Sequence, residues 1–341
     1  MINVGIIGLG FMAATHIKSY RQLEGVRVAA ICNPSGRHLD GDFSKVIGNV
    51  GDNQPVKLDM VGVKATRHFA ELLSDPAIHV IDICAPTAAH RDLCIATLQA
   101  GKHLLCEKPL ARSTEAARAI AQVAAKSPGI FMPAMCLRFW PEWAWLRKTI
   151  VEGTYGKGLS ARFRRVAEPP GWGHNNFFNG TESGGALFDL HIHDTDFVNY
   201  CFGRPASVFS TGYSKMSGAI DHVVTQYDYP GSAIVHAEGS WAMTPGFGFN
   251  MSYTVNFEKA TVDYDIARGV EALRLCENGQ PARFVTCEGP DGYVRELDHF
   301  LQCIRAGVAP SVVNVQDAVT AVEICAAEEK SVLNRQIVAL S

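Results

Sequence analysis

The chain has 341 residues, of which 47% are hydrophobic and 19% charged, as in folded globular proteins and unlike disordered ones. Its 31 Lys and Arg against 34 Asp and Glu give a formal net charge of −3, so a nucleic-acid partner is not expected. No apolar run reaches the roughly 18 residues that cross a bilayer, so a membrane partner is not expected either. The length predicts two domains.

Ten cysteines are scattered along the chain without a C-x-x-C pair, and most lie in apolar patterns. Free cysteine in such patterns behaves as a small hydrophobic residue. The N-terminus lacks the basic region of a signal peptide and runs straight into an apolar strand pattern. We therefore expect a reduced, cytoplasmic protein.

Up to residue 137, short apolar runs alternate with helical patterns, which predicts parallel β-α-β units. The segment Asn33–Val61 is unusually long for a connection and rich in Asp, Gly and Asn, and we interpret it as an insertion without an assigned role. The expected strands are Val4–Ile7, Val26–Cys32, Val80–Cys84, His103–Cys106 and Ile130–Pro133, and the clearest helices are Ala88–Ala100 and Thr114–Ala125.

From residue 138 the pattern changes to alternating apolar and polar residues separated by tight turns, which predicts a largely antiparallel sheet. We therefore predict a second α/β domain over residues 138–341, with its last helices able to pack back on the first domain. The expected strands are Leu159–Val166, Ser207–Tyr213, His222–Tyr229, Ala233–Trp241 and Phe249–Phe257, and the expected helices are Pro141–Glu152, Gly185–Phe202, Val294–Ala306 and Val315–Leu333.

A glycine-rich turn joins the first strand to the first helix. Glycines permit a tight turn and let the backbone approach a pyrophosphate, while the helix N-terminus supplies amide donors. The alternative is a glycine turn in another kind of α/β protein. The G-x-G-x-x-A match predicts dinucleotide contacts from Gly8, Gly10, Phe11, Met12 and Ala13.

The second strand leads to Asn33, where NAD-binding domains often carry an acidic residue for the ribose 2′-hydroxyl. Without that carboxylate, Ser35 and Arg37 could donate hydrogen bonds to a 2′-phosphate. Alternatively, Asn33 binds the ribose of NAD and Arg37 is a surface charge. NAD and NADP both stay open as cofactors, with NADP slightly favoured.

Two further groups of residues point to acid–base chemistry. Lys108 follows a parallel strand and so faces the crevice in which such sheets bind ligands, and Pro109 after it could be cis. Asp189 and His193 stand at i and i+4 of a predicted helix, where a carboxylate can orient an imidazole for proton transfer. A surface lysine and a capped helix with a buried histidine are the alternatives. We expect no metal, because His191 and His193 would face different sides of a helix.

The order of these motifs resembles the Gfo/Idh/MocA family of oxidoreductases. The resemblance spans nearly the whole chain and implies a Rossmann domain followed by an α/β domain with a large open sheet, assembled as a homodimer or homotetramer. It rests on the glycine loop, Ala85-Pro86-Thr87-Ala88-Ala89-His90, Glu107-Lys108-Pro109, Gly184-Gly185 with Asp189 and His193, Leu297–Phe300, Cys303–Gly307 and Glu329–Ser331.

The resemblance implies an NAD(P)-dependent enzyme that transfers hydride between nicotinamide and a secondary alcohol or ketone of a sugar, inositol or related polyol. Lys108 would polarise the reacting oxygen, His193 would be the general acid–base, and Asp189 would orient it. The other residues that the resemblance places around the cofactor are Ala85, Pro86, Thr87, His90, Glu107 and Arg138.

The chain also departs from the family pattern. His191 stands where many members have glycine, which leaves either altered helix packing or a substrate contact. In the aromatic and amide-rich loop Glu168–Asn179, Trp172, His174 and Asn176 suit a polyol, or the loop is anchored by its aromatic residues. Two other functions stay open: an NAD-dependent, redox-assisted glycoside hydrolase, and a non-catalytic nucleotide-binding sensor or regulator.

Overall fold

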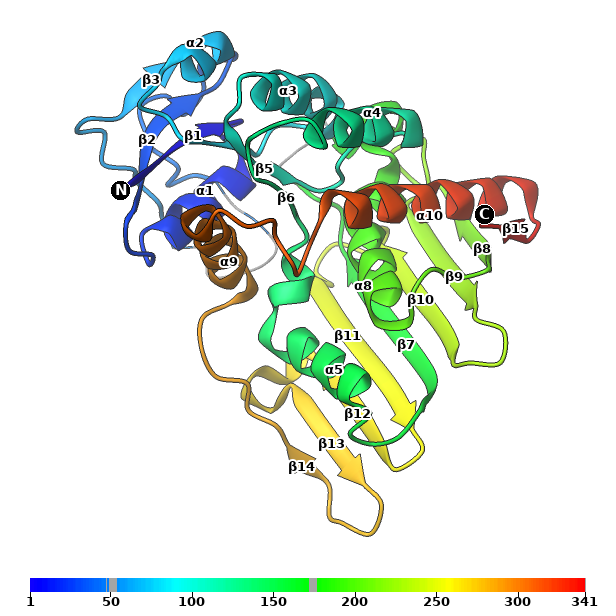
Figure 1. Ribbon diagram of the computed structural model, residues 1–341. Helices are drawn as coiled ribbons and strands as arrows, with labels where there is room; N and C mark the ends of the chain where they lie inside the picture. The colour runs from blue at the N-terminus through cyan, green and yellow to red at the C-terminus, as the bar shows by residue number, and fades with distance from the viewer. Residues whose placement is uncertain (47, 49–53, 172–176, 341) are drawn as a thin grey trace. The chain divides into compact units, whose positions relative to one another are not determined.

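A computed structural model describes residues 1–46, 48, 54–171 and 177–340 (Figure 1). The chain forms two compact units, each of which contains one sheet. The first unit comprises Met1–Phe139 and Pro290–Val319, and the second comprises Trp140–Gly289 and Thr320–Ser341. The predicted fold class, a parallel sheet with helices followed by a large, mostly antiparallel sheet, is confirmed.

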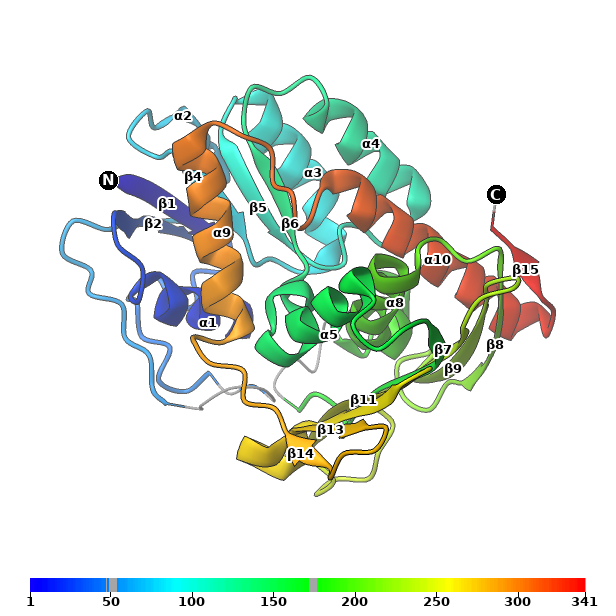
Figure 2. The ribbon, with the colours of Figure 1, turned by 60° about the horizontal axis from the view of Figure 1, so that its bottom comes forward.

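The first unit is a parallel sheet of order β3-β2-β1-β4-β5-β6. Right-handed crossovers put α1 on one face and α2, α3 and α4 on the other, and α9 packs beside α1 (Figure 2). The elements are β1 (Ile2–Ile7), α1 (Phe11–Tyr20), β2 (Val26–Cys32), β3 (Lys64–Thr66), α2 (Phe69–Ser74), β4 (Val80–Ile83), α3 (Thr87–Gln99), β5 (His103–Glu107), α4 (Thr114–Ala124), β6 (Phe131–Ala134), the 3-10 helix η1 (Cys136–Phe139) and α9 (Gly292–Ala306).

Helices on both faces explain why these strands read as continuous apolar runs in the sequence. All five predicted strands are confirmed, and only the short β3 escaped prediction. The strand order reverses beside β1, because the chain passes to β2 on one side and later to β4 on the other. Ligands of such sheets bind at this reversal, outside the carboxyl ends of the strands.

The insertion between β2 and β3 contains little regular structure in its described residues. An isolated bridge joins Asp42 and Lys57, while Phe43 and Val56 are buried. The ring of His38 stacks on Phe43. The insertion therefore packs through a few apolar side chains of its own.

The second unit is a sheet of order β14-β13-β12-β11-β7-β10-β9-β8-β15, in which only β7 and β10 pair in parallel. Its members are α5 (Pro141–Glu152), β7 (Gly158–Ala167), α7 (Gly180–Ser183), the π-helix η2 (Leu187–His191), α8 (Ile192–Phe202), β8 (Ser207–Tyr213), β9 (His222–Asp228), β10 (Ile234–Ser240), β11 (Phe249–Phe257), β12 (Ala260–Asp265), the 3-10 helix η3 (Ile266–Glu271), β13 (Leu273–Glu277), β14 (Arg283–Phe284) and β15 (Val338–Ala339). The last long helix, α10 (Val315–Asn334), begins in the first unit and ends in the second.

One face of this sheet is covered and the other is open. Along β9 the residues are alternately buried and exposed, with Val223, Thr225 and Tyr227 inside. On the covered face, Trp143 of α5 packs edge-on against Phe197 of α8 at a centroid distance of 4.9 Å. These aromatic contacts fix α8 on the sheet, and α8 follows directly after the segment with Asp189.

Candidate active site

The glycine loop of the first unit has the geometry of a pyrophosphate site. Gly8 has a φ of +83°, and a Cβ built on it would lie 2.5 Å from Cα of Ala85, so only glycine fits there. Gly10 is exposed, and a Cβ on it would meet nothing within 4 Å. No side chain of the described residues caps α1. The N-terminus of α1 thus supplies the backbone amides and positive dipole end that suit an anionic ligand.

The side chain of Asn33 shapes the turn after β2. Its Oδ1 accepts hydrogen bonds from the backbone N–H and the hydroxyl of Ser35, at 3.2 and 2.9 Å, and its Nδ2 donates to the carbonyl of Arg37 at 2.9 Å. Ser35 and Arg37 are both exposed at this turn. Asn33 thus holds a turn that presents a hydroxyl and a guanidinium to solvent.

Sequence reasoning missed Arg67, which reaches the same turn. Arg67 follows β3, and a Cβ built on Gly36 would collide with its Nη2. The parallel pairing of β3 with β2 brings Arg67 there, because Thr66 aligns with Cys32. The signal was weak, since β3 has only three residues and directly follows a segment interpreted as an insertion.

Lys108 lies directly after β5, in a turn with a cis peptide bond to Pro109. The amide of Lys108 donates a hydrogen bond to Oε2 of Glu107 at 3.1 Å. Glu107 is buried, whereas Lys108 is partly exposed. At the end of the strand, the Lys108 side chain is therefore accessible to solvent, while the Glu107 side chain stays in the interior.

His90 lies behind this turn. Its Nδ1 lies 2.8 Å from the carbonyl oxygen of Pro109 and its Nε2 lies 2.8 Å from that of Ala85, and the ring is buried. Burial lowers the pKa of His90 more than these two oxygens raise it. A neutral ring carries one N–H and donates to one of the two carbonyl oxygens at a time. The resemblance places His90 in the cofactor crevice, and in the structure both ring nitrogens lie next to backbone carbonyl oxygens.

Arg138 is also buried, near the end of the first unit's main segment. Its Nη1 donates hydrogen bonds to the carbonyl of Val312 at 2.8 Å and to Oδ2 of Asp317 at 3.0 Å. The guanidinium thereby fixes η1 to the segment that leads into α10. The resemblance places this residue near the nicotinamide.

Asp189 and His193 lie in the second unit, after a Gly184-Gly185 turn in which both glycines have positive φ. A Cβ on Gly185 would lie 2.5 Å from the carbonyl oxygen of Ile220, so the turn passes close to another backbone segment. Asp189 and His193 are each partly exposed, whereas most of their neighbours are buried. The side chains of both predicted residues are therefore partly accessible to solvent.

The prediction of one α-helix over Gly185–Phe202 was wrong at its start. Leu187–His191 is a π-helix, and the α-helix begins only at Ile192. A π-helix of five residues makes only one wide turn. One turn is too short to show a sequence periodicity that distinguishes it from an α-helix. Such turns occur frequently at functional sites.

His191, which departs from the family pattern, is fully buried. Its Nε2 lies 3.3 Å from the hydroxyl of Tyr227 and 3.5 Å from Oε1 of Glu328. A Cβ on Gly239 would lie 2.5 Å from Cβ of His191, so His191 uses the space that this glycine leaves.

Two buried contacts fix α8 beneath these residues. The hydroxyl of Thr195 donates to Oε1 of Glu328 at 3.2 Å. Nε of Arg165 donates to Oδ2 of Asp194 at 2.7 Å. Burial raises the pKa of Asp194 although Arg165 opposes the shift. The three candidate substrate residues Trp172, His174 and Asn176 lie outside the described residues.

The parallel sheet, the glycine loop and the helix without a side-chain cap define a dinucleotide-binding protein of the Rossmann class. Residues 2–135 match the family model described as "Oxidoreductase family, NAD-binding Rossmann fold", and residues 143–263 match "GFO/IDH/MocA C-terminal domain". The chain therefore belongs to the Gfo/Idh/MocA family of oxidoreductases, as its motifs predicted.

Named relatives lie within the same family. A scyllo-inositol 2-dehydrogenase (NAD(+)) of Bacillus subtilis is 24% identical over 98% of this chain and 94% of its own length. A trans-1,2-dihydrobenzene-1,2-diol dehydrogenase of Macaca fuscata fuscata is 30% identical over 73% of this chain and 76% of its own. A solved levoglucosan dehydrogenase with NADH and L-sorbose has a TM-score of 0.84 at 22% identity, covering 100% and 99% of the two chains, which shows the shared fold. No helix in the described part of the chain combines the length and hydropathy that a membrane span requires.

Proposed function

We propose that this oxidoreductase is an NAD(P)-dependent dehydrogenase or reductase that acts on a secondary alcohol or ketone of a sugar, inositol or related polyol. The observation that carries the proposal is Lys108 at the carboxyl end of β5, in the same sheet as a glycine loop whose helix lacks a side-chain cap. The inositol and levoglucosan dehydrogenases among the relatives support the substrate class.

The chemistry divides between the two units. When bound, the dinucleotide supplies or accepts the hydride, and its pyrophosphate would be held by the glycine loop, with Ala85, Pro86 and Thr87 beside it. The Lys108 ammonium stabilises negative charge on the reacting oxygen, and the imidazole of His193 accepts or returns the proton. Asp189, at the start of the same helical segment, orients that imidazole.

For the cofactor, we propose a preference for NADP. At the turn after β2, Ser35, Arg37 and Arg67 supply one hydroxyl and two guanidinium groups, and Asn33 uses its side chain within the turn. Guanidinium groups bind phosphate through charge-assisted, often bidentate hydrogen bonds. NAD preference would instead require this turn to hold an unmodified ribose, for which no carboxylate is present at residue 33.

We also propose a homodimer or homotetramer that forms through the open face of the nine-stranded sheet and resides in the cytoplasm. Phe209, Val224 and Ile234 are exposed on neighbouring strands of this face, and all ten cysteines are free. Val224→Glu should reduce the mass measured by light scattering, whereas Val270→Glu, at an exposed residue of η3, should not. An unchanged mass in the first variant would contradict this interface.

The decisive experiment is a titration of cofactor-stripped protein with NAD(H) and NADP(H), followed by a screen of inositols, levoglucosan and related ketones by the absorbance of reduced nicotinamide. We expect tight binding and turnover of at least one polyol. Binding without turnover of any member would contradict the proposal. Release of free sugar from a glycoside without net reduction of cofactor would replace the dehydrogenase with the hydrolase.

A further inference from the structure

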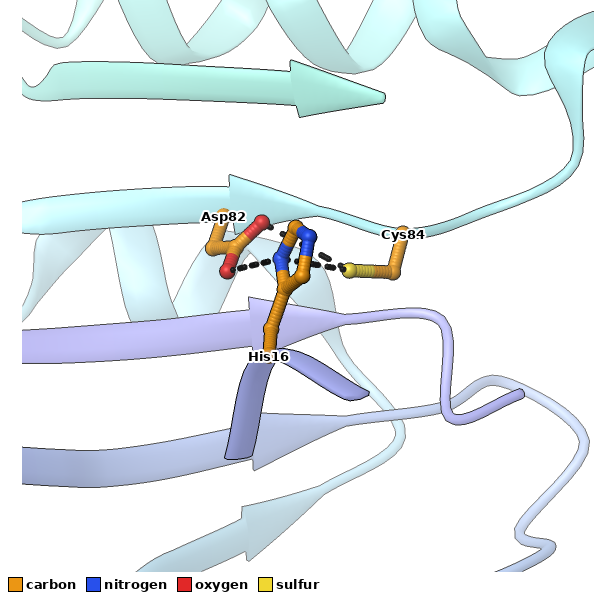
Figure 3. A group of neighbouring side chains, drawn as sticks. All are labelled: His16, Asp82 and Cys84. Carbon is orange, nitrogen blue, oxygen red and sulfur yellow. Dashed lines mark hydrogen bonds and ion pairs between the residues drawn. The ribbon is translucent and has the colours of Figure 1, made fainter. Parts of the chain in front are cut away.

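A charged group is buried in the first unit, behind the glycine loop. His16 of α1 has no exposed surface. Its Nδ1 lies 2.8 Å from Oδ2 of Asp82 in β4, and its Nε2 lies 3.2 Å from Oε1 of Glu107 at the end of β5. Figure 3 shows the ring between Asp82 and Cys84. One imidazole thus contacts the carboxylates of two neighbouring strands.

The contacts indicate that the ring is an imidazolium. Burial, the largest single influence, opposes its charge, but the Asp82 carboxylate and Cys84 together outweigh burial and hold the pKa of His16 well above its usual value. The hydroxyl of Tyr20 donates a second hydrogen bond to Oδ2 of Asp82 at 3.0 Å. A protonated ring carries a hydrogen on each nitrogen: Nδ1 bonds Asp82, while Nε2 faces Glu107 at ion-pair distance without hydrogen-bond geometry.

His16, Asp82 and Cys84 are also residue types that bind metals, and their ligand atoms lie close together. The geometry nevertheless favours the ion-pair network. Both imidazole nitrogens already face carboxylate oxygens, whereas a metal ligand needs a ring nitrogen without a proton. Burial raises the pKa of the Cys84 thiol, and a protonated thiol is a poor ligand.

The network continues to the lysine turn. The second oxygen of Glu107, Oε2, accepts the amide hydrogen of Lys108 at 3.1 Å. On the other side of the turn, the ring of His90 lies 2.8 Å from the carbonyl oxygen of Pro109. The residues immediately before and after Lys108 are therefore each held by a buried histidine.

We propose that His16 and His90 are positioning residues that fix the turn of Lys108 from its two sides, with His16 also joining that turn to the helix of the glycine loop. The inference rests on the proposed role of Lys108 in hydride transfer. Through His16, the helix whose N-terminus would receive the pyrophosphate and the strand end that carries the lysine share one ion-pair network.

Removal of His16 has a specific physical consequence. Asp82 and Glu107 would be left as two buried carboxylates without the cation between them, and buried charges without a partner are strongly unfavourable. The carboxylate of Glu107 would then turn toward another donor. This change weakens the bond that its carboxylate makes with the amide of Lys108.

The test compares the full-length wild type with His16→Gln, His90→Gln and a matched control, Tyr20→Phe. The control removes a donor to the same Asp82 oxygen but no contact of Glu107. The first readout is amide hydrogen exchange at Lys108, measured against the amides of β6. We expect exchange at Lys108 to rise about tenfold in both histidine variants, with β6 unchanged, and the control to match the wild type.

The second readout separates turnover from binding. In His16→Gln we expect kcat for a reactive polyol to fall by about 10- to 100-fold while the dissociation constant of the dinucleotide changes less than about threefold. Equal loss in both parameters would indicate a general structural defect and overturn the proposal. Unchanged exchange at Lys108 would also overturn it, whatever happens to kcat.

Two provisions keep the outcome decisive. If His16→Gln does not fold, Asp82→Asn removes the charge that holds His16 and should produce the same local rise in exchange. If the wild type turns over no polyol, the proposed function fails, while exchange at Lys108 still decides whether the histidines hold the turn.

Discussion

The two units hold their candidate catalytic groups in different ways. Lys108 stands at the end of a parallel strand, and its turn is fixed by His16 and His90, which the neighbouring β-α-β units bring to the same edge of the sheet. Asp189 and His193 stand on a helical segment whose inner side is fixed by long-range contacts, such as that of Thr195 with Glu328, 133 residues further along the chain.

The two units differ in what determines the positions of their candidate catalytic residues. In the first unit, strand ends meet at one edge because the sheet is parallel, so the placement of Lys108 follows from topology. In the second unit, the helix could rotate or shift along the sheet, and buried polar contacts specify one arrangement. Substitutions at both sites can test whether topology or side-chain contacts bear more of the function.

The largest effect should come from the strand end itself. Lys108→Ala removes the cation that stabilises charge on the reacting oxygen, so turnover should fall by on the order of 10³-fold. The dissociation constant of the dinucleotide should stay nearly constant, because the glycine loop is unaltered. Steady-state kinetics and a cofactor titration measure the two quantities, with the exposed Lys126→Ala as the control. Unchanged turnover in Lys108→Ala would move the catalytic role to another residue.

The matching substitution in the second unit is His193→Asn, which removes the group that exchanges the proton. We expect the rate to fall by on the order of 10²-fold, and its pH profile to flatten near neutrality, where histidine titrates. Rates measured across a range of pH provide the test. A profile that keeps its wild-type shape would assign the proton transfer to a different group.

The extent of sequence prediction follows the same division. Five of the six strands of the first unit, the glycine loop and the Lys108 turn were predictable, because apolar runs and glycine turns are local signals. The π turn at Leu187–His191 was not, since a single wide turn leaves no periodicity. Nor did the sequence indicate that Glu328 would lie beside His191, because that contact depends on packing between distant segments.

A stability measurement can test whether buried polar contacts anchor the helical segment of the second unit. Glu328→Ala leaves Thr195, Tyr227 and His191 without their shared buried acceptor, so the free energy of unfolding should fall by about 3 kcal/mol. Glu323→Ala on the same helix removes a pair with Arg204 near the surface and should cost about 0.5 kcal/mol. Urea denaturation of both variants provides the values. Equal losses would show that the buried network does not anchor the helix.

The smallest effect concerns β3, the strand of the first unit that sequence reasoning missed. β3 lies parallel to β2, so the residue after β3 must reach the same edge as the turn after β2, and Arg67 does so at Gly36. If Arg67, placed at this edge by topology, binds the 2′-phosphate, Arg67→Ala should weaken NADP⁺ binding about tenfold. Binding of NAD⁺, which lacks that phosphate, should stay unchanged. Arg27→Ala is the control. Arg27 lies in the first half of β2, away from the turn that follows this strand, and its guanidinium donates a hydrogen bond to Asn3 of β1. Calorimetric titration with both dinucleotides measures the effect. If binding of the two cofactors weakened equally, Arg67 would stabilise the shape of the turn and would not bind the 2′-phosphate. That role would then fall to Arg37 and Ser35.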